Sequence, residues 1–110
     1  MKSFPLVIAL AFVGGIGAGA VALAAAETTI TQKGKQFSES EVSIKRGDTI
    51  VFVNDDNVAH NILSMSPGNE FNLGSQPPGA STPVTFDKDG QIFVICAIHP
   101  LMKLKVKVAD

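Results

Sequence analysis

The chain's rarest side chains lie close together near its C-terminus. The only cysteine, Cys96, is followed at two-residue gaps by His99 and Met102, which are one of two histidines and one of three methionines. The other histidine, His60, lies far upstream and is followed by Asn61. Thiolate, imidazole and thioether together suit copper, and two histidines, a cysteine and a weak axial methionine are typical of electron-transfer copper centres. The residue types therefore indicate a copper site.

Each candidate ligand also has an ordinary structural role when it is taken alone. A cysteine at a strand end is more often a small buried apolar side chain than a ligand. His60 alone could be a satisfied histidine in a turn, and Met102 alone could be a core residue in register with Leu104. Three metal-capable side chains at two-residue gaps, together with the upstream histidine, favour copper binding over these separate roles.

The elements that must position these residues read as short strands separated by turns, a pattern typical of an all-β sandwich or barrel. The clearest strand is Lys103–Val108, in which lysines alternate with apolar residues that should face the core. The expected strands are residues 28–31, 41–44, 49–54, 61–65, 82–86, 91–96 and 103–108, with part of another around Phe37. Residues 66–81 are expected to form a loop, and Asp87–Gly90 a hairpin turn with glycine at a positive φ.

Strand ends are expected to bring the candidate ligands together. Cys96 ends one expected strand and Met102 precedes the next, so the residues between them form a tight loop that can present cysteine, histidine and methionine to one point. His60 also lies at the start of a strand after a loop, and is the candidate for the remaining ligand.

The expected strand 91–96 is apolar on both faces. Ile92, Val94 and Cys96 share one face, and Phe93 and Ile95 share the other. Either the loop at 66–81 covers the outer face, or a partner or second copy does.

Charge is nearly balanced, with 9 Lys+Arg against 10 Asp+Glu, so the composition does not favour nucleic acid as a partner. Lys103, Lys105 and Lys107 form a basic stripe that is either a solvated face or a docking site for an acidic partner. The Asp55-Asp56 pair and Glu70 are expected to be solvated loop charges.

Residues 1–26 have the pattern of a secretory signal peptide. Lys2 precedes a long apolar stretch that has no further charge before Glu27, and Ala24 and Ala26 form a small-x-small cleavage site. We therefore expect a signal peptide helix over residues 1–26, cleavage, and one domain over residues 27–110. The alternative is an uncleaved anchor, because the stretch is long enough to span a bilayer. A single cysteine excludes an internal disulfide in an exported chain.

Residues 28–110 resemble the small blue copper proteins of the plastocyanin, pseudoazurin and amicyanin group. The specific signals are the His60-Asn61 pair and the Cys-x-x-His-Pro-x-Met loop, which is most similar to that of amicyanin. The resemblance implies a Greek-key β-sandwich, with His60, Cys96 and His99 as equatorial ligands and Met102 as the weak axial ligand. Asn61 would hydrogen-bond across to the ligand loop as an outer partner of the metal site.

The ligand region departs from the group's pattern at three positions. Ala97 stands where the group usually has serine or threonine, so a hydroxyl partner for Asn61 is missing. Val94 and Ile92 stand where aromatic residues are common. These departures bear on the colour and potential of the site more than on its metal.

The resemblance implies a mononuclear type 1 copper protein that acts as a soluble one-electron carrier between exported redox proteins. We expect a periplasmic monomer, free of the membrane after signal cleavage, with a quinoprotein dehydrogenase as donor and a c-type cytochrome as acceptor. A periplasmic carrier or buffer for Cu(I) is the alternative. An enzyme is not expected, because cupredoxin-fold reductases and oxidases need further histidine ligands at a second metal and the chain has none left.

Overall fold

The computed structural model describes residues 25–110, so the signal peptide expected over residues 1–26 lies almost wholly outside the described residues. The described part is built of strands and turns without a helix, and so contains no helix that could cross a membrane. Its strands are β1 (Glu27–Lys33), β2 (Gln36–Phe37), β3 (Glu41–Lys45), β4 (Thr49–Asn54), β5 (Ile62–Ser64), β6 (Phe71–Asn72), β7 (Ser81–Thr85), β8 (Gly90–Cys96) and β9 (His99–Ala109).

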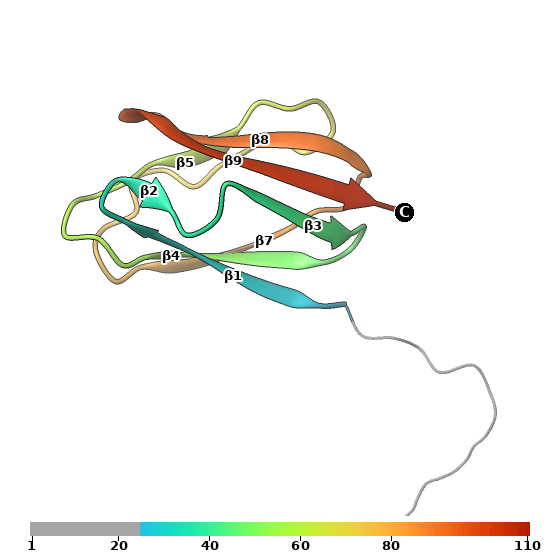
Figure 1. The fold of residues 1–110 in the computed structure, drawn as a ribbon, viewed down its shortest axis with the longest axis horizontal. Coiled ribbons are helices and arrows are strands. Elements are labelled where there is room, and N and C mark those ends of the chain that lie inside the picture. Colours follow the sequence, from blue (N-terminus) through green and yellow to red (C-terminus); the bar gives the residue numbers. More distant parts are fainter. Residues whose placement is uncertain (1–24) are drawn as a thin grey trace, which may run out of the picture.

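The strands form two sheets that pack face to face, as Figure 1 shows. The first sheet has the order β2-β1-β4-β7, and the second has the order β3-β9-β8-β5-β6. Each sheet contains one parallel pair, β1 with β4 and β3 with β9, among antiparallel neighbours. The expected all-β sandwich is therefore confirmed.

The core lies between the two sheets and follows the alternation of the strands. Leu104, Val106 and Val108 of β9 are buried, as the sequence predicts, while Lys103 and Lys107 on the same strand are exposed. Burying every second residue is what an apolar inner face and a solvated outer face require. The other buried apolar residues are Ile30, Ile44, Ile50, Phe52, Ile62, Phe86, Ile92, Val94, Cys96 and Met102.

Strand β9 begins four residues earlier than expected, at His99. A turn of only two residues, Ala97 and Ile98, separates it from β8, and Cys96 and His99 are directly paired across this turn. The register then shifts, so that Ile95 pairs with Lys103 and residues 100–102 bulge from the ladder. Such a bulge re-aims side chains next to functional sites.

The turn at Asp87–Gly90 is not a hairpin, which corrects the prediction. It joins β7 in the first sheet to β8 in the second, so it crosses the sandwich. The predicted positive φ of Gly90 is confirmed at 140°. A hairpin turn with positive φ lies instead between β1 and β2, at Gly34-Lys35. Both residues have positive φ (62° and 59°), as in a type I′ turn. Turn chemistry indicates where the chain reverses but not which sheet it enters next.

The loop at 66–81 does not cover the outer face of β8. Its strand β6 pairs with β5 and so extends the second sheet at its edge. Phe93 stays 50% exposed, and Met65 is 80% exposed. The apolar outer face therefore remains open in the described part of the chain.

Candidate metal centre

Three donor atoms converge at one end of the sandwich. Cys96 Sγ lies 3.7 Å from His60 Nδ1 and 3.6 Å from His99 Nδ1, and the two nitrogens are 3.0 Å apart. These residues come from the end of β8, the start of β9 and the segment before β5. Within residues 25–110, no other group of histidine, cysteine or acidic side chains gathers in this way.

His60 is held by a backbone bridge to the segment before β7. Its N–H donates to Gln76 O at 3.1 Å, and Gln76 N–H donates back to His60 O at 2.7 Å. The His60 side chain is fully buried. This bridge fixes where the ring enters the site.

A buried amide network supports that bridge. Gln76 Nε2 donates to Phe52 O at 2.9 Å, and Gln76 Oε1 accepts from Gln32 Nε2 at 2.9 Å. Asn54 Nδ2 donates to the backbone oxygens of Gln76 and Val58. The segment that carries His60 is thereby tied to β1 and β4. Among the described side chains, the amide oxygen of Gln32 (Oε1) is buried without a hydrogen-bond partner.

Asp56 orients the His60 ring, which the sequence reasoning missed. His60 Nε2 donates to Asp56 Oδ2 at 3.0 Å, which leaves Nδ1 free to present its lone pair to Cys96 and His99. The same carboxylate oxygen accepts from the Lys35 N–H at the tip of the β1-β2 hairpin, at 2.9 Å. This N–H and the His60 imidazole hold the pKa of Asp56 well below its ordinary value. A carboxylate behind a histidine ligand is a common means of fixing its tautomer and orientation.

Asn61 joins the two ligand segments through its backbone, and not through its side chain. Its N–H donates to Cys96 Sγ at 3.3 Å, and its carbonyl accepts from Ala97 N at 2.9 Å. The side chain instead donates to Asn72 Oδ1 at 2.8 Å. The hydrogen bonds expected from Asn61 to the ligand loop are therefore made by its backbone. Its side chain turns to Asn72 of β6, and Ala97 offers it no hydroxyl.

His99 is partly exposed and lines an apolar hollow of about 400 Å³ at the surface. Ile98, Pro100 and Leu101 also line it, and Leu101 is 93% exposed because it lies in the β9 bulge. Met102 also lines this hollow, although its side chain is buried in the core. The bulge thus separates an outward Leu101 from an inward Met102.

The donor set fits a single copper ion. Zinc bonds are about 2.0–2.1 Å to nitrogen and about 2.3 Å to sulfur. With bonds of these lengths, one ion could contact Cys96 Sγ and both histidine Nδ1 atoms at the separations found here. The Asn61 N–H donates one hydrogen bond to the sulfur, and the bond from His60 Nε2 to Asp56 leaves the Nδ1 lone pair for the ion. Soft sulfur with imidazole is a combination that selects copper or zinc over hard cations.

A β-sandwich that gathers two imidazoles, a thiolate and a buried thioether at one end defines a copper-binding cupredoxin. The chain belongs to the copper binding proteins of the plastocyanin/azurin family, whose model matches residues 24–109.

Individual relatives agree with this assignment. The chain is 30% identical over 105 residues to the methylamine utilization protein MauL of Methylorubrum extorquens, covering 94% of this chain and 90% of MauL. The fold is similar to a copper-containing nitrite reductase from Thermus scotoductus (TM-score 0.72, 27% identity), matching 86% of this chain but only 25% of the reductase chain. It is also similar to amicyanin (TM-score 0.68, 23% identity, 80% of this chain and 85% of amicyanin).

Proposed function

We propose that this protein is a mononuclear type 1 copper protein that carries single electrons. His60, Cys96 and His99 would hold the ion, with the thioether of Met102 as the weaker fourth ligand. The convergence of two Nδ1 atoms and one Sγ, with separations of 3.0, 3.6 and 3.7 Å, carries the proposal. Bound copper would supply the one-electron Cu(I)/Cu(II) couple.

The protein's contribution is a site that hardly needs to move. His60 is clamped by its backbone bridge to Gln76 and by Asp56. The Asn61 N–H points at the sulfur, and the Asn61 carbonyl holds the backbone just after Cys96. A donor set fixed in this way keeps the same arrangement for both oxidation states, which suits electron transfer.

Electrons would enter and leave through His99, the partly exposed ligand. Its surroundings are apolar, with Ile98 58% and Leu101 93% exposed. An exposed apolar patch on a small protein is suited to docking, and redox partners meet through small transient contacts. A c-type cytochrome as acceptor and a quinoprotein dehydrogenase as donor remain our proposal for the partners. The link of MauL to methylamine utilization supports it.

We propose that the protein works in the periplasm after export, on the basis of the charge, apolar stretch and Ala24-x-Ala26 pattern of residues 1–26. We propose a carrier and not an enzyme. The match covers only 25% of the nitrite reductase chain, whose activity belongs to the whole protein.

The test is a visible and EPR spectrum after addition of one equivalent of Cu(II). We expect an intense thiolate-to-copper band with narrow hyperfine splitting, bleached reversibly by reductant. Cys96→Ser should abolish the band, whereas Met65→Leu, which alters an exposed thioether far from the ligand loop in sequence, should leave it unchanged. A coloured Cys96→Ser protein would refute the ligand assignment. A weak band with ordinary splitting would favour a Cu(I) carrier or buffer instead.

A further inference from the structure

The outer face of the second sheet carries an apolar patch that nothing in the described residues covers. Phe93 is 50% exposed and Met65 is 80% exposed. Leu63 and Ile95 are partly exposed and are direct cross-strand partners on this face. We name these four residues the sheet patch. It is separate from the apolar rim around His99.

The register of the sheet places opposite charges at the two edges of the sheet patch. On one side, β9 sets Lys103 beside Ile95 and Lys105 beside Phe93. On the other side, β6 sets Asn72 beside Leu63. Glu70 precedes β6 and lines the same surface hollow as Met65. The face therefore runs from lysine through apolar residues to glutamate.

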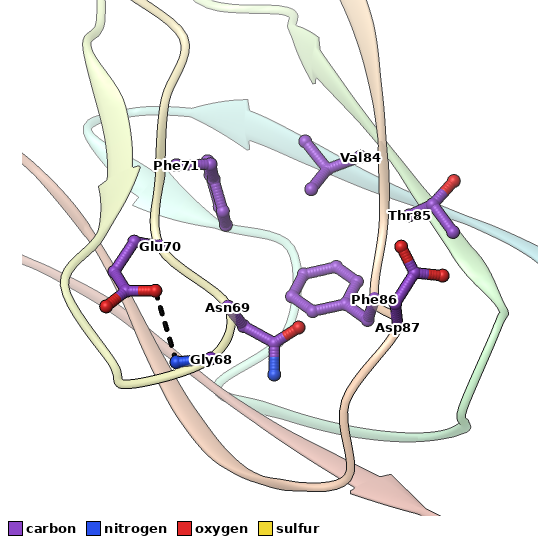
Figure 2. A pocket seen from close by; sticks show the side chains of 8 residues that line it. All are labelled: Gly68, Asn69, Glu70, Phe71, Val84, Thr85, Phe86 and Asp87. Carbon is purple, nitrogen blue, oxygen red and sulfur yellow. Dashed lines mark hydrogen bonds between the residues drawn. The ribbon is translucent and has the colours of Figure 1, made fainter.

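Glu70 belongs to this outer face. Its neighbour Phe71 points inward, with its ring centroid 6.0 Å from that of Phe86. Figure 2 shows Glu70 on the opposite side of the segment from the Phe71 ring, with its carboxylate accepting from the Gly68 N–H at 3.1 Å. The glutamate is exposed and held near the edge of the sheet patch.

The sheet patch also combines an exposed ring with a hollow. Phe93 is half exposed on β8, and a surface hollow of about 540 Å³ lies over β5 and β6 of the same sheet. Leu63, Met65 and Glu70 are among the residues that line the hollow. A phenyl ring is small enough to enter it.

We propose that a second copy of this chain packs on the sheet patch in a symmetric dimer. A two-fold axis that lies in the interface parallel to the strands, between β8 and β5, exchanges the two sides of the patch. It sets Phe93 of each copy into the hollow beside Met65 of the other, and Lys105 of each copy against Glu70 of the other. A two-fold interface must be self-complementary, and this face is. Aligned packing of two sheets is a common way to bury such faces.

The charges favour a second copy over an acidic partner. An acidic partner would need a uniformly positive surface, but Glu41 lies on the same edge. Its carboxylate is 3.1 Å from Lys107 and 3.8 Å from Lys105, so Lys105 is the more loosely paired of the two lysines and can still meet Glu70 of a second copy. The opposite edge carries Glu70, which would repel an acidic surface. The net charge of −1 offers little repulsion between copies. A dimer would replace the monomer expected from the sequence.

Sedimentation of the purified protein between micromolar and millimolar concentration tests this proposal, without copper and with it. We expect a monomer–dimer equilibrium that does not depend on copper, so the result stands apart from the function proposed above. Glu70→Lys and Lys105→Glu should each weaken the dimer by about tenfold or more, because each change places like charges together twice in a symmetric interface. An equimolar mixture of the two variants should restore dimers.

A pair of matched variants tells the sheet patch from the rim around His99. Phe93→Glu should abolish the dimer, whereas Leu101→Glu, at an equally apolar but more exposed position, should leave it intact. Circular dichroism verifies that both variants fold. A wild-type protein that stays monomeric at millimolar concentration would overturn the proposal. So would a dimer that survives Phe93→Glu or the separate charge reversals, or one that Leu101→Glu dissolves.

Discussion

The two histidines of the metal centre lie in very different surroundings. His60 is fully buried, is bridged to Gln76 through both backbone groups and is hydrogen-bonded to Asp56 through Nε2. His99 is partly exposed, follows a two-residue turn and lines an apolar surface hollow. One half of the site is embedded in a polar framework and the other half faces outward.

This difference divides two requirements of electron transfer between two parts of the chain. The polar framework around His60 holds the donor geometry, while the apolar surroundings of His99 allow a partner to approach. Buried polar groups rigidify a site only when they are almost fully satisfied. In the described residues, every buried side-chain nitrogen or oxygen has a hydrogen-bond partner except Oε1 of Gln32.

The largest contrast is expected from His60→Gly and His99→Gly. Both should lose the intense copper band, because each removes a ligand. Added imidazole should restore colour to His99→Gly, because the space left by the His99 ring opens on the surface hollow of about 400 Å³. It should not restore colour to His60→Gly, because the space left by the His60 ring is fully buried. Absorbance during imidazole titration measures this. Equal rescue of both variants would show that burial does not separate the two histidines.

Gln76→Leu should break the framework itself. The buried Gln32 amide would lose its partner, at a cost of about 1–3 kcal/mol in the free energy of unfolding. Urea unfolding of the copper-free protein gives this value. Gln91→Leu, at an exposed position on β8, is the matched control and should change stability by less than about 0.5 kcal/mol. Equal effects of the two changes would contradict a special role for Gln76.

Asp56→Asn should weaken copper binding with little effect on the fold. Loss of the carboxylate behind a ligand typically lowers metal affinity by about 10- to 100-fold. Competition titration measures the affinity, and the nitrogen chemical shifts of His60 report its tautomer without copper. Asp55→Asn alters an exposed neighbour and is the control. An unchanged tautomer and affinity in Asp56→Asn would mean that the Gln76 bridge alone suffices.

The smallest effect is expected at Asp48, which lies in the turn between β3 and β4. Figure 1 shows this turn at the opposite end of the sandwich from the turn between β8 and β9. Its carboxylate accepts from the Lys45 N–H, which lowers its pKa, and in the uncleaved chain it also accepts from the Ala26 N–H, which lowers it further. The stability that it adds is present above the ordinary carboxyl pKa of about 3.9 and is lost as pH falls through the lowered value.

Asp48→Asn should therefore be less stable than wild type at neutral pH, and the gap should close in acid. Thermal unfolding across pH measures the gap, with the exposed Asp89→Asn as control. Copper affinity should be unchanged. A gap that persists below the lowered pKa would point to a cause other than the carboxylate charge.

The sequence predicted the parts of the molecule that depend on local pattern. Leu104, Val106 and Val108 faced the core as their alternation indicated, and the structure brings His60, Cys96 and His99 together as expected. These features follow from side-chain period and from rare residue types. Neither prediction required knowing every strand pairing, although the second depends on the fold bringing His60 to Cys96 across 36 residues of sequence.

The missed features all depend on pairing between distant segments. Asp56 looked like a loop charge, and only the fold shows that the Lys35 hairpin tip and His60 meet there. Gln32 and Gln76 are polar residues in unremarkable contexts, and their role exists only because β1 lies near the His60 segment. Asn61 faced Asn72 because β6 extends the second sheet, which composition could not reveal.

The two-residue turn between Cys96 and His99 has a consequence for the order of folding. The β8-β9 hairpin needs only local contacts, which form fast, whereas His60 must arrive from a segment 36 residues upstream of Cys96. A chain that has closed the hairpin but not docked β5 holds one sulfur and one imidazole, without the clamped second ring. Such a half-formed chain should bind metal weakly, so copper insertion is expected to follow folding.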